Sequence, residues 1–512
     1  MSVGLLMALP SGLIVSGVAR WAVRLANGLV REGRRAGLIL HAPAGAYRPL
    51  RMEVDARVVV TDLTHLPPIE SCGGEVGVYL TGYREAVGAM ARAGAVVLSP
   101  NLVGDCYAAA ARAMLERPGD TRLVGWLHSD TAYEYHVPRH FEAAVSRFVA
   151  VSGAIETKAR ACLPGREADV TRIGYGVESP ARLPERATLK GRAVRVVYAG
   201  RMERWQKRVL ALPAMSRSLT ARGVSHEVVI LGDGPAGAEL RRACAGLREV
   251  VVLGPQEPER VAGVLARADI AVLGSRYEGL PIAVLEAMAQ GCVPVVTRTA
   301  SGAAEVIEDG VSGVIVEVGE EASEADVGAA LAAGVERAMA QVESMREAAW
   351  ARVREAYSVE GHARAVARMM DEVAAKPARA WPSGRACAFS GAGGGSVPAE
   401  GWDRVRAVSA ALEGKRVVVH GTGRHTRELV APALEAGLLA GVVAFTDDDP
   451  AAWGGEVAGR PVVRPEEAGS TGATEVVVSS WIHQGAIMAR RGMYERQGLA
   501  VHALYAEESA GR

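Results

Sequence analysis

Two successive series of short apolar runs, separated by helical patterns, constrain the fold of this chain more than any other feature. The first series spans about residues 1–180 and includes SVGLLMAL, AGLILHAP, AGAVVLSP and SRFVAVS. The second begins at RAVRVVYAGR and continues through SHEVVILGDGP, REVVVLGP, ADIAVLGS and CVPVVTRT. Strands that alternate with helices form mostly parallel sheets wrapped by helices. We therefore predict an α/β chain whose two sheets form two lobes.

Length and composition shifts suggest where these units begin and end. A chain of 512 residues has room for about three domains at roughly 150 residues each. We predict a first lobe over residues 1–182 and a second over 183–376, the second ending in a long helical stretch. Residues 377–400, crowded with Gly, Pro, Ala and Ser, predict a flexible linker. A smaller third unit, 401–512, repeats the order strand, Gly turn, helix, strand.

Charge and cysteine usage narrow the range of partners. Lys plus Arg and Asp plus Glu both total 58, so no overall charge draws the chain to nucleic acid, and an anion must be bound locally. The six cysteines lie far apart without a CxxC pair, which favours reduced thiols over a metal site. The N-terminus lacks the features of a signal peptide, and no apolar stretch reaches about 18 residues. We expect a cytoplasmic protein.

The stretch from Gly274 to Gly291, GSRYEGLPIAVLEAMAQG, carries the chemistry most clearly. Pro281 suits the first turn of a helix and Gly291 its end, which predicts a helix of roughly three turns. Glu286 then lies inside this helix and Glu278 in the loop before it. A helix N-terminus favours an anion, and carboxylates accept hydrogen bonds from hydroxyls. Phosphate and polyol together suggest a sugar nucleotide.

A purely structural reading of the two carboxylates stays open, because acidic groups near a helix start also stabilise its dipole without any ligand. The preceding run ADIAVLGS is strand-like, so the loop leaves the carboxyl end of a strand. Open α/β sheets bind their ligands at that end of their strands. The context therefore favours a binding site.

A basic pair follows the first strand of the second series. Arg201 and Lys207 come just after RVVYAG, and together they can neutralise a diphosphate and stabilise it as it leaves. The alternative is that both are ordinary solvated surface charges. The turn LGDGP, Leu231 to Pro235, either lets the backbone approach a ligand or simply turns sharply.

The ordered elements GR, QKR, LGDGP, LGP, SRYEGLP with LEAMAQG, and SGAAEVIEDGVSG resemble the nucleotide-binding lobe of the retaining glycosyltransferases of family four, which have the GT-B fold. The resemblance is dense over about residues 195–318. It extends more thinly into the first lobe through SGLIVSGVARWAVRLANGLVREG, FVAVSGAI and RIGYGVE. It implies two Rossmann-like lobes that face a cleft, with the acceptor on the first lobe and the donor on the second.

The resemblance also assigns roles around the donor diphosphate and its sugar. Arg201 and Lys207 would hold the diphosphate, with backbone amides of Gly279 and Leu280. Glu278 would bind hydroxyls of the donor sugar. The usual Lys-Gly is Lys207-Arg208 here and the usual Gly-Gly is Ser301-Gly302, and the second departure bears on how closely the backbone approaches the acceptor.

Four further residues complete the implied donor site. Glu286 would take the ribose hydroxyls and Gln256 would lie near the base. His128, in WLHSD, would face the donor sugar, unless it is a histidine satisfied at a strand end. Gly17, near the turn after the first strand, would let the chain approach the donor phosphate or the acceptor, or it belongs only to a loop.

The resemblance implies a metal-independent reaction that retains configuration, with the nucleoside-diphosphate sugar as co-substrate and no cofactor. We find no trustworthy metal-binding DxD element in the sequence. The acceptor would be a glycan, a lipid or a small molecule with a hydroxyl group. The helical stretch RWAVRLANGLVREGRR carries several arginines that either contact anionic lipid at the inner membrane face or are simply solvated: Arg20, Arg24, Arg31, Arg34 and Arg35.

The third unit carries a weaker nucleotide motif. Gly421 and Gly423 follow the strand KRVVVH, and Asp447 ends the next strand, a spacing that suits a dinucleotide fold. Thr426 stands where that fingerprint has Gly or Ala. The run GVVAFTDDDPAAWGGEVAGRPVV resembles the small nucleotide-sugar-binding domain of some sugar acyltransferases. We interpret the unit as a binding or regulatory module, with a docking domain as the alternative.

Three functions therefore remain. The first is a glycosyltransferase. The second is a catalytically inactive sugar-nucleotide-binding scaffold with a regulatory third unit. The presence of the expected site residues argues against this alternative: Arg201, Lys207, Glu278 and Glu286. The third is a nicotinamide-dependent oxidoreductase that acts through residues 401–512 and predicts NADH binding there.

Overall fold

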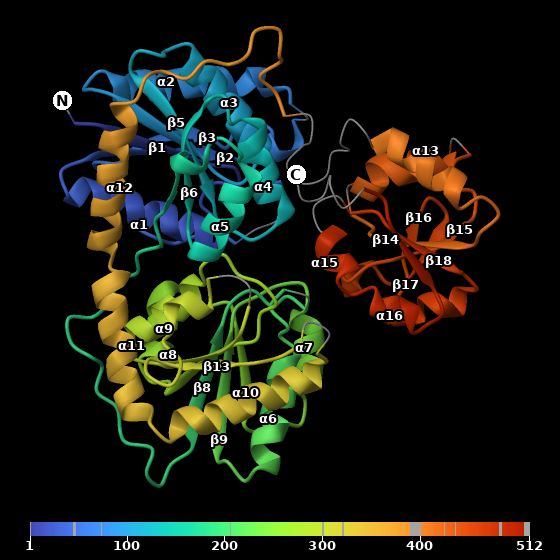
Figure 1. The fold of residues 1–512 in the computed structure, drawn as a ribbon. Helices are drawn as coiled ribbons and strands as arrows, with labels where there is room; N and C mark the ends of the chain where they lie inside the picture. Colours follow the sequence, from blue (N-terminus) through green and yellow to red (C-terminus); the bar gives the residue numbers. More distant parts are fainter. Residues whose placement is uncertain are drawn as a thin grey trace.

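The computed structural model describes residues 2–505 except 45–47, 73, 205, 300–301, 320–321, 390–400, 424, 436 and 481–483. Three separate sheets, of seven, six and six strands, follow one another along the chain. Helices flank each sheet, and the colours in Figure 1 run from a blue first lobe through a green and yellow second lobe to an orange and red third unit. The predicted α/β class is confirmed.

The first lobe is a parallel sheet in the order β3-β2-β1-β4-β5-β6-β7. The central strand β1 is apolar and all six of its residues are buried, as expected for a strand of a parallel sheet that helices cover on both faces. Its strands and α-helices are β1 (Gly4–Leu9), α1 (Gly17–Arg31), β2 (Arg35–His41), β3 (Val59–Leu63), α2 (Leu80–Ala91), β4 (Val96–Pro100), α3 (Gly104–Leu115), β5 (Thr121–Leu127), α4 (Ala132–His140), β6 (Val145–Ala150), α5 (Gly153–Cys162) and β7 (Val170–Arg172).

The second lobe has the strand order β10-β9-β8-β11-β12-β13, and the predicted boundary at 182/183 falls before its first strand. The chain runs outward from β8 to β10 and then returns to the other side of β8, so the order reverses between β8 and β11. The loops after these two strands therefore flank a switch point, where open α/β sheets bind ligands. The elements are β8 (Val194–Ala199), α6 (Ala211–Ala221), β9 (His226–Leu231), α7 (Gly237–Ala243), β10 (Val250–Gly254), α8 (Pro258–Leu265), β11 (Ile270–Leu273), α9 (Ile282–Ala289), β12 (Val293–Thr297), β13 (Val314–Val316), α10 (Glu324–Met339) and α11 (Val342–Ala356).

The last helix before the predicted linker, α12 (Val359–Ala374), returns to the first lobe. Figure 1 shows α11 and α12 as one column that connects the two lobes. Gly28 of α1 lies so close to α12 that a Cβ atom there would be 3.2 Å from Ala363 and from Val359. The indole N–H of Trp21 donates to Nε2 of His362 at 3.0 Å. The closing helix predicted for the second lobe therefore packs against the first.

The predicted linker differs from the structure in its first half. Residues 377–389 pack on the first lobe, where Phe389 is only 1% exposed and the ring of His140 hydrogen-bonds the carbonyl of Ala388 at 2.9 Å. Gly104 at the start of α3 leaves room for Phe389, because a Cβ there would lie 2.1 Å from its ring. Residues 390–400 lie outside the described part of the chain. We refer to residues 377–389 as the docked strap.

The third unit is a six-stranded sheet in the order β16-β17-β15-β14-β18-β19, parallel apart from the pair β16 and β17. Its elements are α13 (Gly401–Ala411), β14 (Val417–His420), a π-helical turn (Thr426–Val430), α14 (Ala431–Glu435), β15 (Val442–Thr446), β16 (Glu456–Val457), β17 (Arg460–Val463), β18 (Glu475–Val478), α15 (Gln484–Met488), α16 (Gly492–Glu495) and β19 (Ala500–Ala503). Across the residues that the structure describes, none of the helices combines the length and apolar character needed to span a membrane.

Candidate functional site

Helix α9 forms almost where the sequence predicts it. It covers Ile282–Ala289, with Pro281 as its N-cap in an extended conformation, and the chain turns away at Gly291, whose φ is +74°. Glu286 lies inside the helix, as expected. Two details were wrong: Pro281 precedes the first turn instead of occupying it, and eight residues make little more than two turns.

Lys207 and Glu278 meet at the switch point of the second sheet. The Lys207 ammonium donates to Oε1 of Glu278 at 2.5 Å, and the hydroxyl of Ser275 donates to the same oxygen at 2.6 Å. The Glu278 side chain is 7% exposed and that of Lys207 is 18% exposed. The two loops are also joined through their backbones, because the Arg276 amide donates to the carbonyl of Gln206 at 2.8 Å. The structure thus brings together two predicted site residues that are 71 positions apart.

Arg201 lies on the same loop as Lys207 but is exposed. Its guanidinium forms no ion pair or hydrogen bond within the described residues, whereas its backbone carbonyl accepts from the Tyr198 hydroxyl at 2.8 Å. Burial, aided by the Glu203 and Glu278 carboxylates, raises the pKa of Tyr277 to about 12, and the charge of Arg201 opposes this shift. Arg201 is therefore within electrostatic reach of the loop that carries Glu278.

The glycines of the LGDGP turn pack closely against another segment of the protein, the loop after β8. A Cβ atom on Gly232, whose φ is +129°, would lie 1.8 Å from the carbonyl oxygen of Gly200. A Cβ on Gly234 would lie 2.4 Å from that of Met202. These glycines therefore let the turn pack against the loop that carries Arg201, which accounts for them without a ligand.

Gly279 and Leu280 lie where the two lobes touch. A Cβ atom on Gly279 would be 2.0 Å from the carbonyl oxygen of His128 at the end of β5. Leu280 is 5% exposed, and the amide of Gly302 donates to the carbonyl of Gly279 at 3.1 Å. Ser301, the departure noted beside Gly302, lies outside the described residues. Gly17, at the start of α1, faces the same region, since a Cβ there would be 3.6 Å from Ile282 of α9.

His128 is engaged by the protein on both ring nitrogens. Nδ1 lies 2.8 Å from the Tyr175 hydroxyl and Nε2 lies 3.0 Å from Oδ1 of Asn101. Its ring stacks with those of Trp126 and Tyr175, and burial lowers the pKa of His128 to about 3. The imidazole is therefore neutral near pH 7. This is the satisfied strand-end histidine of the alternative reading, and the predicted contact with a sugar stays a prediction.

Glu134 is a buried carboxyl group that the sequence analysis missed. Its Oε2 accepts the backbone N–H of His128 at 3.0 Å, and burial raises the pKa of Glu134 to about 8, against which that hydrogen bond acts. The available signal was Thr131-Ala-Tyr-Glu134, the pattern of a helix capping box. In the structure this glutamate does not cap α4 but supports the backbone beside His128.

Glu286 is bound across the lobes by two arginines of α1. Arg24 donates through Nη2 to Oε1 at 2.6 Å, and Arg20 donates through Nη1 to Oε2 at 3.2 Å. The expectation that the arginines of α1 are solvated or face lipid is wrong for this pair. It is also wrong for Arg34, which pairs with Asp371 of α12 at 2.6 Å. These side chains hold elements of the protein together.

The other arginines of α1 and its end behave differently. Arg31 is exposed and donates to the carbonyl of Asn27 at 3.2 Å. Arg35 is partly buried and donates to backbone carbonyls of Ser2, Met90 and Ala95. Arg31 alone of the five thus fits the solvated reading.

Gln256 is half-buried in the loop after β10, two strands away from β8, and its side-chain amide donates to the carbonyl of Leu253 at 2.9 Å. It lies at the same edge of the sheet as the Lys207 loop, because both follow the carboxyl ends of parallel strands. Its predicted place near the base stays a prediction.

In the third unit, Gly421 and Asp447 follow neighbouring strands, as the motif predicts. Oδ2 of Asp447 accepts the backbone N–H of Thr422 at 2.6 Å and its hydroxyl at 2.8 Å. Gly423 is exposed. Thr426 lies 2.9 Å from the hydroxyl of Ser479 and begins a π-helical turn, where the fingerprint has a regular helix. Asp447 thus joins the loops that follow β14 and β15.

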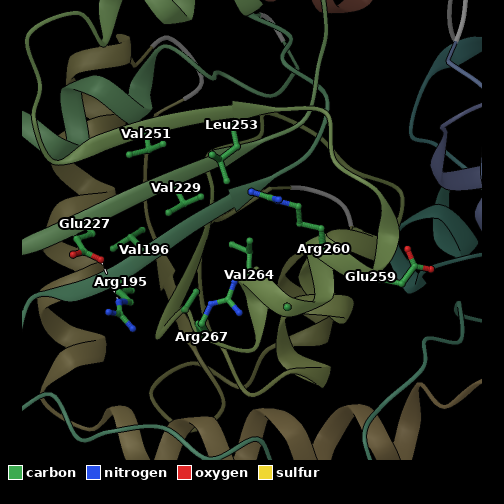
Figure 2. Close-up of a pocket in the computed structure, with 12 residues that line it drawn as sticks. Arg195, Val196, Glu227, Val229, Val251, Leu253, Glu259, Arg260, Val264 and Arg267 are labelled. Carbon is green, nitrogen blue, oxygen red and sulfur yellow. Dashed lines mark hydrogen bonds and ion pairs between the residues drawn. The ribbon is translucent and has the colours of Figure 1, made fainter.

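A hollow of about 710 Å³ lies between strands β8, β9 and β10 of the second sheet and helix α8, away from the Lys207–Glu278 pair. Figure 2 shows its apolar floor of Val196, Val229, Val251 and Leu253, with Arg260 and Arg267 reaching over it from α8 and the turn that follows. None of the predicted site residues lines it. No group of three or more His, Cys, Asp or Glu side chains among the described residues is arranged to hold a metal ion.

The second lobe is similar in sequence to known glycosyltransferases. Residues 193–339 match the sequence model of the family described as Glycosyl transferases group 1. The alpha-D-kanosaminyltransferase of Streptomyces kanamyceticus is 36% identical over 139 residues, which is 27% of this chain and 35% of that protein. A D-inositol 3-phosphate glycosyltransferase of Corynebacterium kroppenstedtii is 31% identical over 172 residues, 30% of this chain and 36% of its own. The chain thus spans little more than a third of these curated relatives.

Solved structures show the same fold over both lobes. Anabaena HepE, crystallised with UDP and glucose, aligns with a TM-score of 0.55 at 18% identity, over 72% of this chain and 99% of its own. A glycosyltransferase from Rickettsia africae aligns with a TM-score of 0.57 at 16% identity, over 73% and 99%. The expected GT-B architecture is confirmed. Within this fold, the match to the glycosyl transferases group 1 model falls on residues 193–339 of the second lobe.

Proposed function

We propose that this protein is a retaining glycosyltransferase that moves a sugar from a nucleoside-diphosphate sugar to a hydroxyl group of an acceptor. The observation that carries the proposal is the Lys207–Glu278 pair, 2.5 Å apart and largely buried, at the switch point of the second sheet. Glu278 lies in the loop before α9, which touches the first lobe at His128, and Lys207 reaches it from the loop after β8. A cation, a carboxylate and a helix N-terminus together suit a phosphate bound next to a polyol.

In this scheme the chain's cations stabilise the leaving group. An ammonium group has three donors, so Lys207 can hold Glu278 and still donate to a phosphate oxygen. Arg201, exposed on the same loop, would add a second positive charge. These charges act on the negative charge that develops on the diphosphate, which is the role a metal ion plays in other transferases. We therefore propose a metal-independent reaction.

Glu278 and Glu286 would hold the sugar hydroxyls and the ribose, respectively. The bond between the anomeric carbon and the phosphate oxygen breaks as the acceptor oxygen bonds to that carbon from the same face. The acceptor proton passes to the departing phosphate, so configuration is retained and no separate carboxylate base is needed. Contact between the lobes would exclude water. The acceptor, a glycan, a lipid or a small molecule, would approach from the first lobe.

A two-step binding and turnover experiment tests this function. Thermal shifts with UDP, GDP, ADP and TDP identify the base, and UDP is the first choice because HepE was crystallised with it. Release of the nucleoside diphosphate from the matching sugars is then measured with mixed hydroxyl acceptors and with water alone. Binding together with release supports a transferase. Binding without release across the donors and acceptors supports the inactive scaffold instead, and absence of both overturns the site assignment.

We propose that the third unit, residues 401–512, is a binding or regulatory module. If it were a nicotinamide-dependent oxidoreductase, the full chain would quench or shift NADH fluorescence, and Asp447→Ala would abolish the signal. We expect no NADH signal, because Thr426 stands where the dinucleotide fingerprint has Gly or Ala and begins a π-helical turn in place of a regular helix.

A further inference from the structure

Arg24 is a buried charge whose hydrogen bonding is incomplete. Its side chain is 10% exposed, and its described polar contact is the bond from Nη2 to Oε1 of Glu286 at 2.6 Å. Its Nε and Nη1 atoms are buried and have no hydrogen-bond partner in the described residues. Burial of a guanidinium with unsatisfied donors is unfavourable, and the carboxylate beside it offsets part of that cost.

The carboxylate comes from the opposite lobe. Arg24 lies on α1 of the first lobe and Glu286 on α9 of the second. Arg20, one helical turn before Arg24, binds the other oxygen of Glu286 at 3.2 Å and is 19% exposed. Gly17, a further turn back, faces Ile282 at the start of α9. One face of α1 therefore follows α9, and the arginines reach Glu286 only while the lobes are in contact.

We propose that Arg20 and Arg24 are positioning residues for the donor site: from the first lobe they orient the Glu286 carboxylate that takes the donor ribose. This inference rests on the proposed function. An ionised carboxylate has about four lone-pair positions, and the two arginines use one on each oxygen, so ribose hydroxyls can bind the same group. Glu286 is thus fixed in orientation when the lobes are closed and released when they separate.

Donor affinity is then coupled to lobe closure. A donor that binds the closed arrangement more tightly shifts the population toward it, and the arginines supply part of that preference. Arg24→Lys keeps the charge but loses the planar fork, so it restores only part of the effect. A buried charge that merely stabilised the fold would lower the melting temperature without changing the donor KM selectively.

The test compares Arg24→Ala, Arg24→Lys and Arg20→Ala with Arg31→Ala, an exposed arginine of the same helix. Donor KM and kcat are measured with the nucleoside-diphosphate sugar chosen by the thermal-shift panel, and the radius of gyration is measured without ligand. We expect Arg24→Ala to raise KM about tenfold, a coupling of about 1.4 kcal/mol. Arg24→Ala should lower kcat by less than tenfold and should increase the radius of gyration. We expect intermediate values for Arg24→Lys and wild-type values for Arg31→Ala.

Two outcomes overturn the proposal. The first is a donor KM within twofold of wild type in both Arg24→Ala and Arg20→Ala. The second is an unchanged radius of gyration in both variants. Arg20 is the more exposed of the two, so Arg20→Ala keeps the test available if Arg24→Ala fails to fold. If no donor turns over, the proposed function has failed, whereas the scattering comparison still decides whether the arginines hold the lobes together.

Discussion

Lys207 and Glu278 form an ion pair, and each is also expected to bind the donor: Lys207 its diphosphate and Glu278 the hydroxyls of its sugar. The Glu278 side chain is 7% exposed, and the Lys207 ammonium and the Ser275 hydroxyl both donate to its Oε1. Removal of either partner from a largely buried pair leaves the other uncompensated. A substitution at this pair therefore needs a check of folding alongside any measurement of activity.

Lys207→Ala should lower turnover by about 100-fold or more, because a preorganised positive charge on the leaving diphosphate is lost. The measurement is the rate of nucleoside-diphosphate release at saturating donor, with circular dichroism to confirm folding. Lys190→Ala, at an exposed lysine, is the matched control and should behave as wild type. We expect Glu278→Ala to show a comparable loss. Near-wild-type turnover in either folded variant would remove the pair from the site.

At this scale the sequence predicted residue types and local spacing but not partners from distant segments. Glu278 and Lys207 belong to recognisable motifs, and the structure joins them. The arginine partners of Glu286 lie more than 260 positions away, and nothing in the pattern of α1 pointed to them. Glu134 was missed because its local pattern is that of a helix cap, whereas its burial depends on how α4 packs against β5.

At the scale of elements, the loop between β11 and α9 connects the donor lobe to the first lobe. Gly279 fits against the carbonyl of His128 because it has no side chain. The amide of Gly302 donates to the carbonyl of Gly279 and holds the loop in place. The strand, loop and helix were predictable from apolar length, Pro281 and Gly291. The contact with β5 was not, because it depends on how two lobes meet.

Gly279→Ala should abolish most turnover while the second lobe still binds the nucleotide. The added Cβ would lie 2.0 Å from a backbone oxygen, so the lobes must move apart. Turnover and the thermal shift with the selected nucleoside diphosphate check this prediction. Gly88→Ala, in helix α2 with open space around the new methyl group, is the control. Wild-type turnover in Gly279→Ala would show that this contact does not matter to the reaction.

The docked strap shows why composition misled the linker prediction. Gly, Pro and Ala indicate irregular backbone, but irregular backbone can still pack, and Phe389 supplies the apolar side chain that does so. The ring of Trp381 lies 5.6 Å from that of Phe141, which adds a second anchor. A sequence pattern without periodicity therefore could not separate a mobile segment from a docked one.

Truncation should separate the strap from the third unit. A chain that ends at residue 389 keeps Phe389 in place and should retain wild-type turnover and melting temperature for the two lobes. A chain that ends at residue 376 loses that side chain and should melt several degrees lower, since burial of a Phe contributes about 2 kcal/mol. Equal melting temperatures for the two truncations would show that the strap does not stabilise the first lobe.

At the scale of the whole molecule, polar contacts at the edges of the two lobes hold them together. Glu305 of the second lobe accepts the backbone amides of Gly153 and Ala154 at 2.7 and 2.8 Å and so caps α5 of the first. Arg48 and Glu257 add an exposed pair at 2.7 Å. The sequence predicted two sheets and a third unit, but no local pattern encodes which charges meet between the two lobes.

Stability should fall as the pH drops from about 6.5 toward 4. Burial lowers the pKa of His41, His362 and His425 to about 4 and that of His128 to about 3. The unfolded chain takes up these protons from about pH 6.5 downward, whereas the folded chain resists them, so acid favours unfolding. Glu134, with its raised pKa, acts in the opposite direction and costs stability as the pH rises toward 8.

The melting temperature measured by calorimetry between pH 7 and pH 4.5 checks this dependence, with an expected fall of about 5 °C or more. His362→Gln keeps an acceptor for the Trp21 indole but cannot be protonated, so its pH dependence should be shallower. A melting temperature that stays constant over this range would contradict the assignment of neutral buried histidines.

A crystal structure with the nucleoside diphosphate selected by the thermal-shift panel would locate the donor site of this protein. We expect the diphosphate between Lys207, Arg201 and the N-terminus of α9, with the ribose on the Glu286 carboxylate while Arg20 and Arg24 remain bound to it. Density for the nucleotide in the third unit beside Gly421, or in the hollow beside α8, with the Lys207–Glu278 pair untouched, would contradict it.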